Sequence, residues 1–494
     1  MSVINGSDAS GPAGARIFVR LTGTQPFLPW SDHSLTSRTC GVENRIMRVS
    51  RSVLHPLFVS AVAGLFLPAA ASAGVIGTNE IARSVTRERI VAILPKKQQK
   101  AWLAYMERSE KQQAIDKQTL QDEAKAAGVA DPKYAPHGFA FGMRGQHSPD
   151  WFTSAEALRI AHNIVSYQLP DGGWSKNIDM ATGPRAPGER YDTNNLNRFS
   201  QPGDFDTPLD PNWNYIATLD NDSTWMQIRF LAGVTSALIA AHRDAEAAPL
   251  LKSVERGVEY LLNAQYPNGG WPQVWPLEGR YHDAITINDD AMLHAIEILR
   301  DVADRAPDYS HLPQRLARRA GPAAQRGIDC LLKLQISRHG VKTAWAQQYD
   351  ALTLEPTSAR NYEMPALASG ESVPIVDFFM NLPNPTPAEV AAVRDAAAWF
   401  KKTEIFGYRY GSGNFFADRR SPEGRKLEKD PGAGPIWARF YQIGTDKPIF
   451  GDRDKTIHDN VNDLSRERRN GYAWFNTEGV AMLAQYKTWA QAHP

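Results

Sequence analysis

Two short acidic segments could supply oxygen ligands for a metal ion. The first reads Leu219-Asp-Asn-Asp-Ser-Thr224, and the second reads Tyr281-His-Asp-Ala-Ile-Thr-Ile-Asn-Asp-Asp290. Carboxylates interspersed with amide and hydroxyl oxygens suit a hard cation such as Ca²⁺, which takes roughly six to eight oxygen ligands. The spacing differs from that of an EF-hand, because neither its central glycine nor its terminal glutamate is in place.

The same segments could instead cap helices. Each of them precedes a helical pattern, so Asp222, Ser223 and Asp289 stand where helix N-caps are expected. Asp220 and Asp283 lie too far ahead of those helices to be obvious caps, which favours them as the metal ligands. For the other residues of the two segments, both interpretations stay open.

Several basic side chains could face these carboxylates across a cleft. Lys176 follows a Gly-Gly-Trp turn, Arg360 lies in a loop bracketed by two prolines, and Arg439 and Arg453 lie in a Pro-, Gly- and Arg-rich region at 418–472 that is predicted to form long loops. Arginine matches a carboxylate bidentately. For any one arginine, a solvated charge or a simple ion pair is the commoner role. A rim with both Ca²⁺ ligands and arginines would suit a polyuronide.

A repeated pattern of helices and turns must position these residues. A helical pattern, a glutamine and a turn with glycine and tryptophan occur in this order three times, with helices at 154–167, 254–264 and 323–334. Glycine permits a positive φ in such turns, and tryptophan folds back as an apolar plug. Further helices are predicted at 223–241, 289–304, 372–382, 389–405 and 477–492, with Ser372 as the cap of a helix from Val373 to Met380 and a possible hairpin at 407–416. Paired helices at repeated turns predict an all-α fold, an α/α toroid with a cleft at one rim.

The N-terminal region has the three parts of a secretory signal. Residues 47–51 are basic, residues 57–67 are apolar, and Ala71-Ser-Ala73 precede Gly74. A run of about 11 apolar residues is too short for a bilayer, which needs roughly 20. We expect residues 47–73 to be a signal peptide, residues 1–46 to be an upstream extension with Met47 as the true start, and the mature protein to be secreted or periplasmic.

Composition and charge indicate a globular protein. Hydrophobic residues make up 42% and charged residues 22% of the chain, and the net charge of +1 indicates neither nucleic acid nor a membrane as a partner. Cys330 alone would remain after cleavage, so the mature chain could form no internal disulfide. We expect a monomer with an N-terminal helical arm at 74–150 and a catalytic domain at 151–494.

Many of these motifs resemble those of the family 10 pectate lyases. The similar motifs are Asp171-Gly-Gly-Trp-Ser-Lys-Asn177, Leu219-Asp-Asn-Asp222, Tyr266-Pro-Asn-Gly-Gly-Trp-Pro272, Tyr281-His-Asp283, Ala359-Arg-Asn-Tyr-Glu-Met-Pro365, Ser369-Gly-Glu-Ser372, Trp437-Ala-Arg-Phe-Tyr441, Pro448-Ile-Phe450 and Glu467-Arg-Arg-Asn-Gly-Tyr472. The resemblance runs from about Arg89 to the C-terminus and keeps the order of the motifs. It implies an (α/α)₃ toroid with long rim loops, cleavage of polygalacturonate by β-elimination, and dependence on Ca²⁺.

The resemblance also implies roles for individual residues. Arg360 matches the catalytic base, and Asp220 and Asp283 match acidic positions near the Ca²⁺ ion. The positions expected to bind substrate are Lys176, Asn221, Thr286, Arg439 and Arg453. A guanidinium normally stays protonated to above about pH 12, so an arginine base predicts an alkaline pH optimum.

Three alternative functions fit parts of the pattern. A lyase or hydrolase for another polyuronide, such as alginate, would use the same charged rim. A terpene-cyclase-like toroid would contain the same turns, but an arginine-rich rim and export argue against it. A non-catalytic uronide-binding protein would need no base. Formation of an unsaturated product from polygalacturonate, followed by ultraviolet absorbance, would distinguish the lyase from all three.

Overall fold

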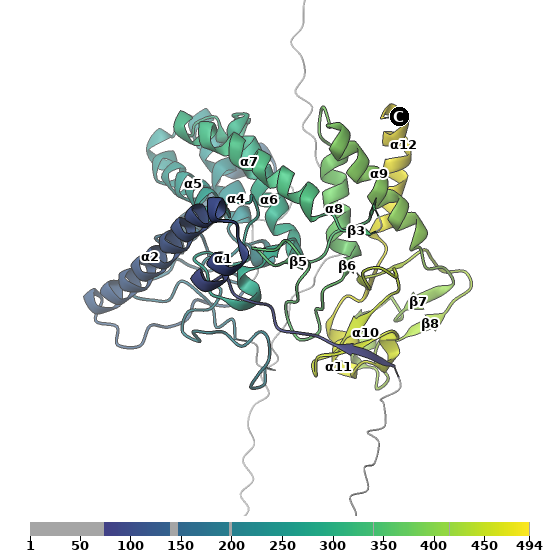
Figure 1. The fold of residues 1–494 in the computed structure, drawn as a ribbon. Coiled ribbons are helices and arrows are strands. Elements are labelled where there is room, and N and C mark those ends of the chain that lie inside the picture. The colour runs from purple at the N-terminus through teal and green to yellow at the C-terminus, as the bar shows by residue number, and fades with distance from the viewer. Residues whose placement is uncertain (1–73, 139–146, 197–199, 339, 414, 494) are drawn as a thin grey trace, which may run out of the picture. The chain divides into compact units, whose positions relative to one another are not determined.

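The computed structural model describes residues 74–138, 147–196, 200–338, 340–413 and 415–493, which contain twelve α-helices and thirteen short strands (Figure 1). The helices are α1 (Arg87–Ile93), α2 (Lys96–Ala126), α3 (Ala155–Ser166), α4 (Trp225–Ala240), α5 (Asp244–Ala264), α6 (Ala291–Ala303), α7 (Gln314–Leu334), α8 (Ser369–Met380), α9 (Pro387–Lys402), α10 (Phe415–Arg420), α11 (Arg466–Gly471) and α12 (Glu478–Ala492). Three of the 3₁₀ helices carry site residues: η2 (Asp220–Asp222), η3 (Arg280–Asp283) and η4 (Asn288–Asp290). The predicted upstream extension and signal peptide lie outside the described residues. Every helix in the described part falls short of the length and apolar character that crossing a membrane requires.

Most of the larger helices pack against the helix that follows them in the sequence. α4 packs against α5, α6 against α7, and α8 against α9, and the C-terminal α12 also packs against α8 (Figure 1). In α7, buried Leu316, Ala320, Ala324 and Leu331 recur every three to four residues or at twice that spacing, so the helix has one apolar face to bury. The predicted helical segments are confirmed, although α5 and α7 begin well before the residues where they were expected.

The repeated turns are held by the same hydrogen bonds each time. The side-chain amides of Gln168, Gln265 and Gln335 each donate to a carbonyl oxygen of their own turn and to one of the second α-helix after that turn, which is α5, α7 and α9 respectively, at 2.8 to 3.0 Å. Gly172 and Gly269 both have a φ of +100°, and a side chain on either would collide with a backbone carbonyl of α5 or α7, respectively. The glutamine and the glycine are therefore both needed for these turns to contact α5 and α7.

The prediction of an all-α (α/α)₃ toroid is wrong. Alongside the helices, the described residues form six small antiparallel sheets. The strands are β1 (Val75–Thr78), β2 (Ile285–Thr286), β3 (Ser337–Arg338), β4 (Val341–Lys342), β5 (Gln348–Tyr349), β6 (Leu367–Ala368), β7 (Tyr408–Tyr410), β8 (Leu427–Lys429), β9 (Trp437–Ala438), β10 (Phe440–Tyr441), β11 (Phe450–Gly451), β12 (Thr456–His458) and β13 (Phe475–Asn476). The predicted hairpin at 407–416 is also wrong, because β7 pairs with β8, which lies beyond that segment. The fold therefore contains both helices and sheets, and the short strands connect loops to one another by backbone hydrogen bonds.

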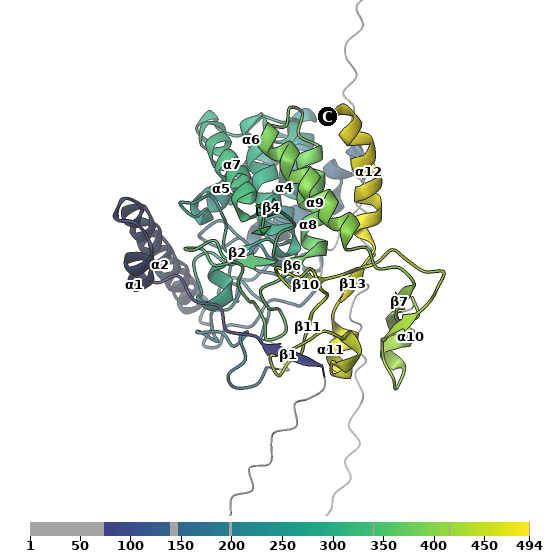
Figure 2. The same cartoon turned by 45° about the vertical axis from the view of Figure 1, so that its right-hand side comes forward.

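The N-terminal segment is joined to distant parts of the chain. β1 pairs with β12 in the three-stranded sheet β1-β12-β11 (Figure 2). On α2, the rings of Trp102 and Tyr105 lie 5.0 and 4.8 Å from the ring of Tyr266, and the Tyr105 hydroxyl donates to the Ala264 carbonyl oxygen at 2.9 Å. The predicted helical arm, interrupted at Pro95, is therefore packed against the second repeated turn.

Candidate active site

Arg360 lies on a tight turn in the loop between β5 and β6. The Glu363 backbone N–H closes the turn by donating to the Arg360 carbonyl oxygen at 2.9 Å. The Asn79 side-chain amide, which follows β1, donates to the carbonyl oxygens of Arg360 and Asn361 at 3.2 and 3.0 Å. The loop predicted from its prolines is confirmed, and the N-terminal segment holds its backbone in place.

The helix after this loop begins earlier than predicted. α8 starts at Ser369, so the prediction that Ser372 caps a helix from Val373 is wrong. The buried Ser372 hydroxyl instead donates to the Ala368 carbonyl oxygen at 2.6 Å and accepts from the Trp345 backbone N–H at 2.9 Å. Ser372 therefore connects α8 to the third repeated turn.

The Arg360 guanidinium forms a bidentate ion pair with Glu363. Its Nε and Nη2 donate to the two carboxylate oxygens at 2.8 and 2.5 Å. The rings of Tyr362 and Tyr472 lie 5.1 and 5.8 Å from the guanidinium carbon. Burial alone would lower the pKa of Arg360, but Glu363, Tyr362 and Tyr472 together raise that pKa well above its usual value. Without substrate, Arg360 is therefore a cation.

Asp220 and Asp289 carry neighbouring carboxyl groups, called here the acidic pair; Asp220 is buried, whereas Asp289 is exposed to solvent. η2 and η4, which carry them, contact each other, and the Asn221 backbone N–H donates to Asp289 Oδ2 at 3.3 Å. The protein that surrounds the carboxyl group of Asp289 disfavours its charge, and together with the charge of Asp220 it raises the pKa of Asp289 to about 8. Burial would also raise the pKa of Asp220, but Lys176 lowers it to about 2. Two carboxyl groups this close favour a shared proton or a cation between them.

The backbone that carries the acidic pair is strained. The residues before α4 and α6 are Thr224 and Asp290, and neither side chain accepts a capping hydrogen bond, so the capping interpretation is not supported. Asn221 and Asp289 instead have positive φ angles of 51° and 54°. Such conformations cost about 1 to 3 kcal/mol each and cluster at functional sites.

Lys176 supplies the cation next to Asp220. Its ammonium group forms an ion pair with Asp220 and lies 3.3 Å from the centre of the Tyr215 ring. Gln273 Nε2 donates to the other Asp220 oxygen at 2.9 Å. The structure thus brings together three of the predicted residues, Asp220, Asn221 and Lys176.

Asp283 has different partners from Asp220. Its Oδ2 accepts from the Val85 backbone N–H at 2.9 Å and its Oδ1 from the Gly279 backbone N–H at 2.7 Å. Burial outweighs these bonds and raises the pKa of Asp283 to about 7. Asp283 therefore anchors the N-terminal segment, and the structure does not bring it together with Asp220 through a described contact.

Thr286 is enclosed in the fold. Its backbone N–H donates to the Trp271 carbonyl oxygen at 3.0 Å, and β2 pairs it with Gln348 of β5. Its buried hydroxyl has no hydrogen-bond partner among the described residues. In this structure the Thr286 side chain has no access to solvent, unlike the other predicted substrate-binding residues.

Arg439 connects the acidic pair to the Arg360 turn. Its guanidinium forms an ion pair with Glu371, donates to Asn288 Oδ1 at 3.3 Å, and lies 4.7 Å from the centre of the Tyr472 ring. Burial would lower the pKa of Arg439, but Glu371 raises it above its usual value. Asn288 directly precedes Asp289, so Arg439 lies between the two parts of the site.

Arg453 and Arg468 share one carboxylate. The Nε of each donates to Glu467 Oε2 at 2.8 Å, and both guanidinium groups face the Tyr362 ring, at 5.6 and 4.1 Å. We call Arg360, Arg439, Arg453 and Arg468 the arginine cluster. Burial would raise the pKa of Asp220, and the charge of Arg360 acts with Lys176 and Asp289 to lower it. The arginine cluster and the acidic pair therefore belong to one site.

The acidic pair could hold part of a cation's ligand shell. The described residues contain no group of three His, Cys, Asp or Glu side chains placed to hold a metal. The two carboxylates are hard oxygen donors, and Ca²⁺ requires roughly six to eight oxygens. The donor set therefore fits a Ca²⁺ ion that is shared with an anionic ligand and water, and does not fit a site closed by protein groups alone.

Sequence reasoning did not assign roles to several residues of this site. They are Tyr362, Glu363, Glu371, Arg468 and Tyr472, whereas Asp289 was considered both as a helix cap and as part of an acidic segment that could bind a metal. Glu363 follows Arg360 by three residues inside a predicted turn, a spacing that could have indicated the ion pair. Arg468 lies in α11 and Tyr472 directly follows that helix, and no local signal places them beside Arg360.

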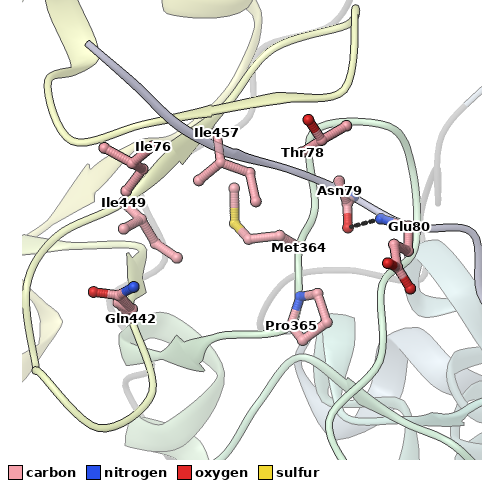
Figure 3. A pocket seen from close by; sticks show the side chains of 9 residues that line it. All are labelled: Ile76, Thr78, Asn79, Glu80, Met364, Pro365, Gln442, Ile449 and Ile457. Carbon is pink, nitrogen blue, oxygen red and sulfur yellow. Dashed lines mark hydrogen bonds between the residues drawn. The ribbon is translucent and has the colours of Figure 1, made fainter.

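A cavity of about 320 Å³ adjoins the Arg360 turn (Figure 3). It is lined by Ile76, Thr78, Asn79, Glu80, Met364, Pro365, Gln442, Ile449 and Ile457. Figure 3 shows the Met364 side chain directed at Ile457, so much of the wall is apolar. Of the lining residues only Glu80 is charged, so the cavity does not suit a polyanion.

The chain is similar to known proteins in sequence and in structure. A sequence model described as pectic acid lyase matches residues 168–483. Two solved structures are similar: a family 10 polysaccharide lyase from Cellvibrio cellulosa, with 28% identity, a TM-score of 0.56 and coverage of 69% of this chain and 95% of that chain, and a mutant of that lyase in complex with trigalacturonic acid, with 27% identity, a TM-score of 0.55 and coverage of 70% and 99%. Comparison with curated proteins gave no match.

Proposed function

The chain belongs to the pectic acid lyase family and is a pectate lyase, and we propose that it cleaves polygalacturonate by Ca²⁺-dependent β-elimination with Arg360 as the base. The observation that carries the proposal is the presence of the acidic pair and the arginine cluster in one site. The guanidinium groups of Arg360, Arg439 and Arg453 are partly exposed and can bind the carboxylates of neighbouring sugars bidentately, whereas Arg468 is buried. The related lyase in complex with trigalacturonic acid supports the same substrate class.

In the proposed reaction, Arg360 first gives up its proton to solvent, and the neutral guanidine then accepts the proton from C5 of a galacturonate residue. The electrons of the C5–H bond form the C4=C5 double bond, the C4–O4 bond breaks, and O4 leaves with its electron pair and takes a proton from solvent. Arg439 and Arg453 orient the carboxylates, and the Tyr362 and Tyr472 rings limit the positions that the guanidinium groups can take.

The proposed Ca²⁺ ion would be held by Asp220 and Asp289 together with a substrate carboxylate. When bound, Ca²⁺ would withdraw charge from the C6 carboxylate and so make the C5 hydrogen more acidic. Asp289 has to lose its proton to serve as a ligand, and Lys176 has to move from Asp220 or share it. Asp283 stays a predicted ligand, although its backbone partners favour a structural role.

The deciding experiment is an assay with polygalacturonate in the presence and absence of Ca²⁺. Calcium-dependent growth of ultraviolet absorbance from the conjugated product would support the proposal. New reducing ends without absorbance would indicate a hydrolase, and neither signal would indicate a binding protein. Arg360→Lys is expected to lower turnover by about 10³-fold with circular dichroism unchanged, and near-normal turnover would remove Arg360 from the role of base.

Export is a separate part of the proposal. We expect the protein to be secreted or periplasmic after cleavage before Gly74, and to be a monomer. Mass spectrometry of the exported protein tests the cleavage site, because a mature mass that includes residues before Gly74 would contradict it. Light scattering of the same sample tests the oligomeric state.

A further inference from the structure

We propose that Glu363 is a positioning residue that both orients Arg360 and holds it in the protonated form, so that removing the Glu363 charge moves the reaction to lower pH. The inference rests on the proposed role of Arg360 as the base. It goes beyond that role, because it assigns the resting charge of the base to one carboxylate.

Both carboxylate oxygens of Glu363 accept hydrogen bonds that hold the Arg360 turn. Its Oε2 accepts from the backbone N–H and from Nε of Arg360 at 3.0 and 2.8 Å. Its Oε1 accepts from Arg360 Nη2 at 2.5 Å and from the Tyr472 hydroxyl at 2.6 Å. The Glu363 side chain is 3% exposed. Four donors on one buried carboxylate leave Arg360 little freedom to rotate.

The same carboxylate opposes the loss of a proton from Arg360. Burial would raise the pKa of Glu363, but Arg360 lowers it to about 2, so Glu363 is an anion at every pH where the enzyme is expected to act. Arg360 also interacts electrostatically with six other titratable or charged groups. They are Tyr215, Asp220, Tyr281, Tyr362, Arg468 and Tyr472. Among the groups that raise the pKa of Arg360, Glu363 makes the largest contribution. The orientation that Glu363 gives to Arg360 therefore favours catalysis, whereas the negative charge of Glu363 opposes the deprotonation of Arg360.

A matched ion pair elsewhere in the chain provides the control. Arg243 and Glu246 have the same spacing of three residues, and Arg243 Nε and Nη2 donate to the two carboxylate oxygens at 2.7 and 2.8 Å. These side chains are 34% and 45% exposed, and they begin α5 on the surface. Glu246→Gln makes the same chemical change without reaching the proposed base.

The test is the pH dependence of kcat at saturating Ca²⁺, followed by ultraviolet absorbance. Glu363→Gln keeps the size of the side chain and an acceptor but removes the charge, so the alkaline rise of activity should move to lower pH by about one unit. Glu363→Leu also removes the hydrogen bonds and should lower kcat by about 10²-fold. Glu246→Gln should leave the profile unchanged. A Glu363→Gln profile that superimposes on that of the wild type would overturn the inference.

A second variant keeps the inference testable if Glu363→Gln does not fold. Tyr472→Phe removes one donor from Glu363 and concentrates its charge on Arg360, so the alkaline rise should move to higher pH by a few tenths of a unit. A move to lower pH would overturn the inference. The proposed function fails separately: if Arg360→Lys retains turnover, Arg360 is not the base, whereas loss of turnover together with an unmoved Glu363→Gln profile contradicts only the role of Glu363.

Discussion

Asp220 and Asp283 were both predicted to be metal ligands, but in the structure their carboxylates have different types of hydrogen-bond donor. Both are buried aspartates in short 3₁₀ helices that follow a repeated turn. The oxygens of Asp220 are held by side chains, the Lys176 ammonium and the Gln273 amide. Both oxygens of Asp283 are held by backbone N–H groups.

The donor type separates a binding site from a structural anchor. Side-chain donors can rotate away, so the oxygens of Asp220 can be transferred to a cation at small cost to the fold. Backbone donors cannot leave without moving the chain, and Val85 belongs to the segment that precedes α1. We therefore expect changes at Asp220 to affect activity and changes at Asp283 to affect stability.

The largest effect is expected from Asp220→Asn. The variant removes one charge from the acidic pair, and kcat/KM should fall by about 10²-fold or more because a partner of the proposed cation is lost. The melting temperature should stay within a few degrees of that of the wild type. Initial rates over a Ca²⁺ titration measure the change, and activity within twofold of the wild type would contradict the assignment.

Asp283→Asn should act on stability. An amide nitrogen facing the N–H of Val85 or Gly279 leaves a buried donor unpaired, at a cost of about 1 to 3 kcal/mol. The pKa of Asp283 is raised in the folded state, so the wild type loses unfolding free energy as the pH rises from about 4 to about 7. The free energy of unfolding of the variant should not show this fall with pH. Urea unfolding at several pH values measures both the destabilisation and its dependence on pH.

The same variant can also restore the original prediction for Asp283. If Asp283→Asn abolishes the response to Ca²⁺ while the free energy of unfolding is unchanged, Asp283 is a metal ligand and its backbone bonds are secondary. The Ca²⁺ titration used for Asp220→Asn therefore applies to both variants.

The difference between the two aspartates could not be read from the sequence, whereas the turns around them could. Gln168 and Gly172 make their contacts within one turn and with α5, and residues of the same types recur at the later turns, so the pattern is visible in the sequence. The donors to Asp283 depend on where Val85 lies after folding, almost 200 residues away in sequence. Pairing of two-residue strands, such as β6 with β10, leaves no periodic signal either, which is why the all-α prediction failed.

The arginine cluster shows the same limit. Arg360, Arg439 and Arg453 were candidates from local chemistry, for which a surface charge was the commoner role, and the resemblance to a family assigned them functions. Arg468 in α11 and Tyr472 after it join them from more than 100 residues away in the sequence. Glu363, in contrast, is a close neighbour of Arg360 in sequence and was predictable from the turn.

Cation binding by the acidic pair should depend on pH. The pKa of Asp289 is raised to about 8, first by the surrounding protein and then by Asp220, so below that pH a cation has to displace a proton. The apparent Ca²⁺ affinity should rise about tenfold per pH unit up to about pH 8 and then level off. Calorimetric titrations without substrate measure this slope. Asp289→Asn should remove the slope and Asp283→Asn should keep it, and the reverse pattern would exchange their roles.

The smallest effect is expected from Lys176→Met. Its ammonium neutralises Asp220, so a cation has to compete with it, and its removal should tighten Ca²⁺ binding about two- to fivefold. Lys117→Met is the matched control, because Lys117 pairs with Asp210 at 2.8 Å and lies 5.5 Å from the Trp213 ring, away from the acidic pair. The control should leave the Ca²⁺ affinity unchanged. Weaker binding in Lys176→Met would mean that the lysine orients Asp220 for the cation, and the side-chain donors of Asp220 would then be as fixed as the backbone donors of Asp283.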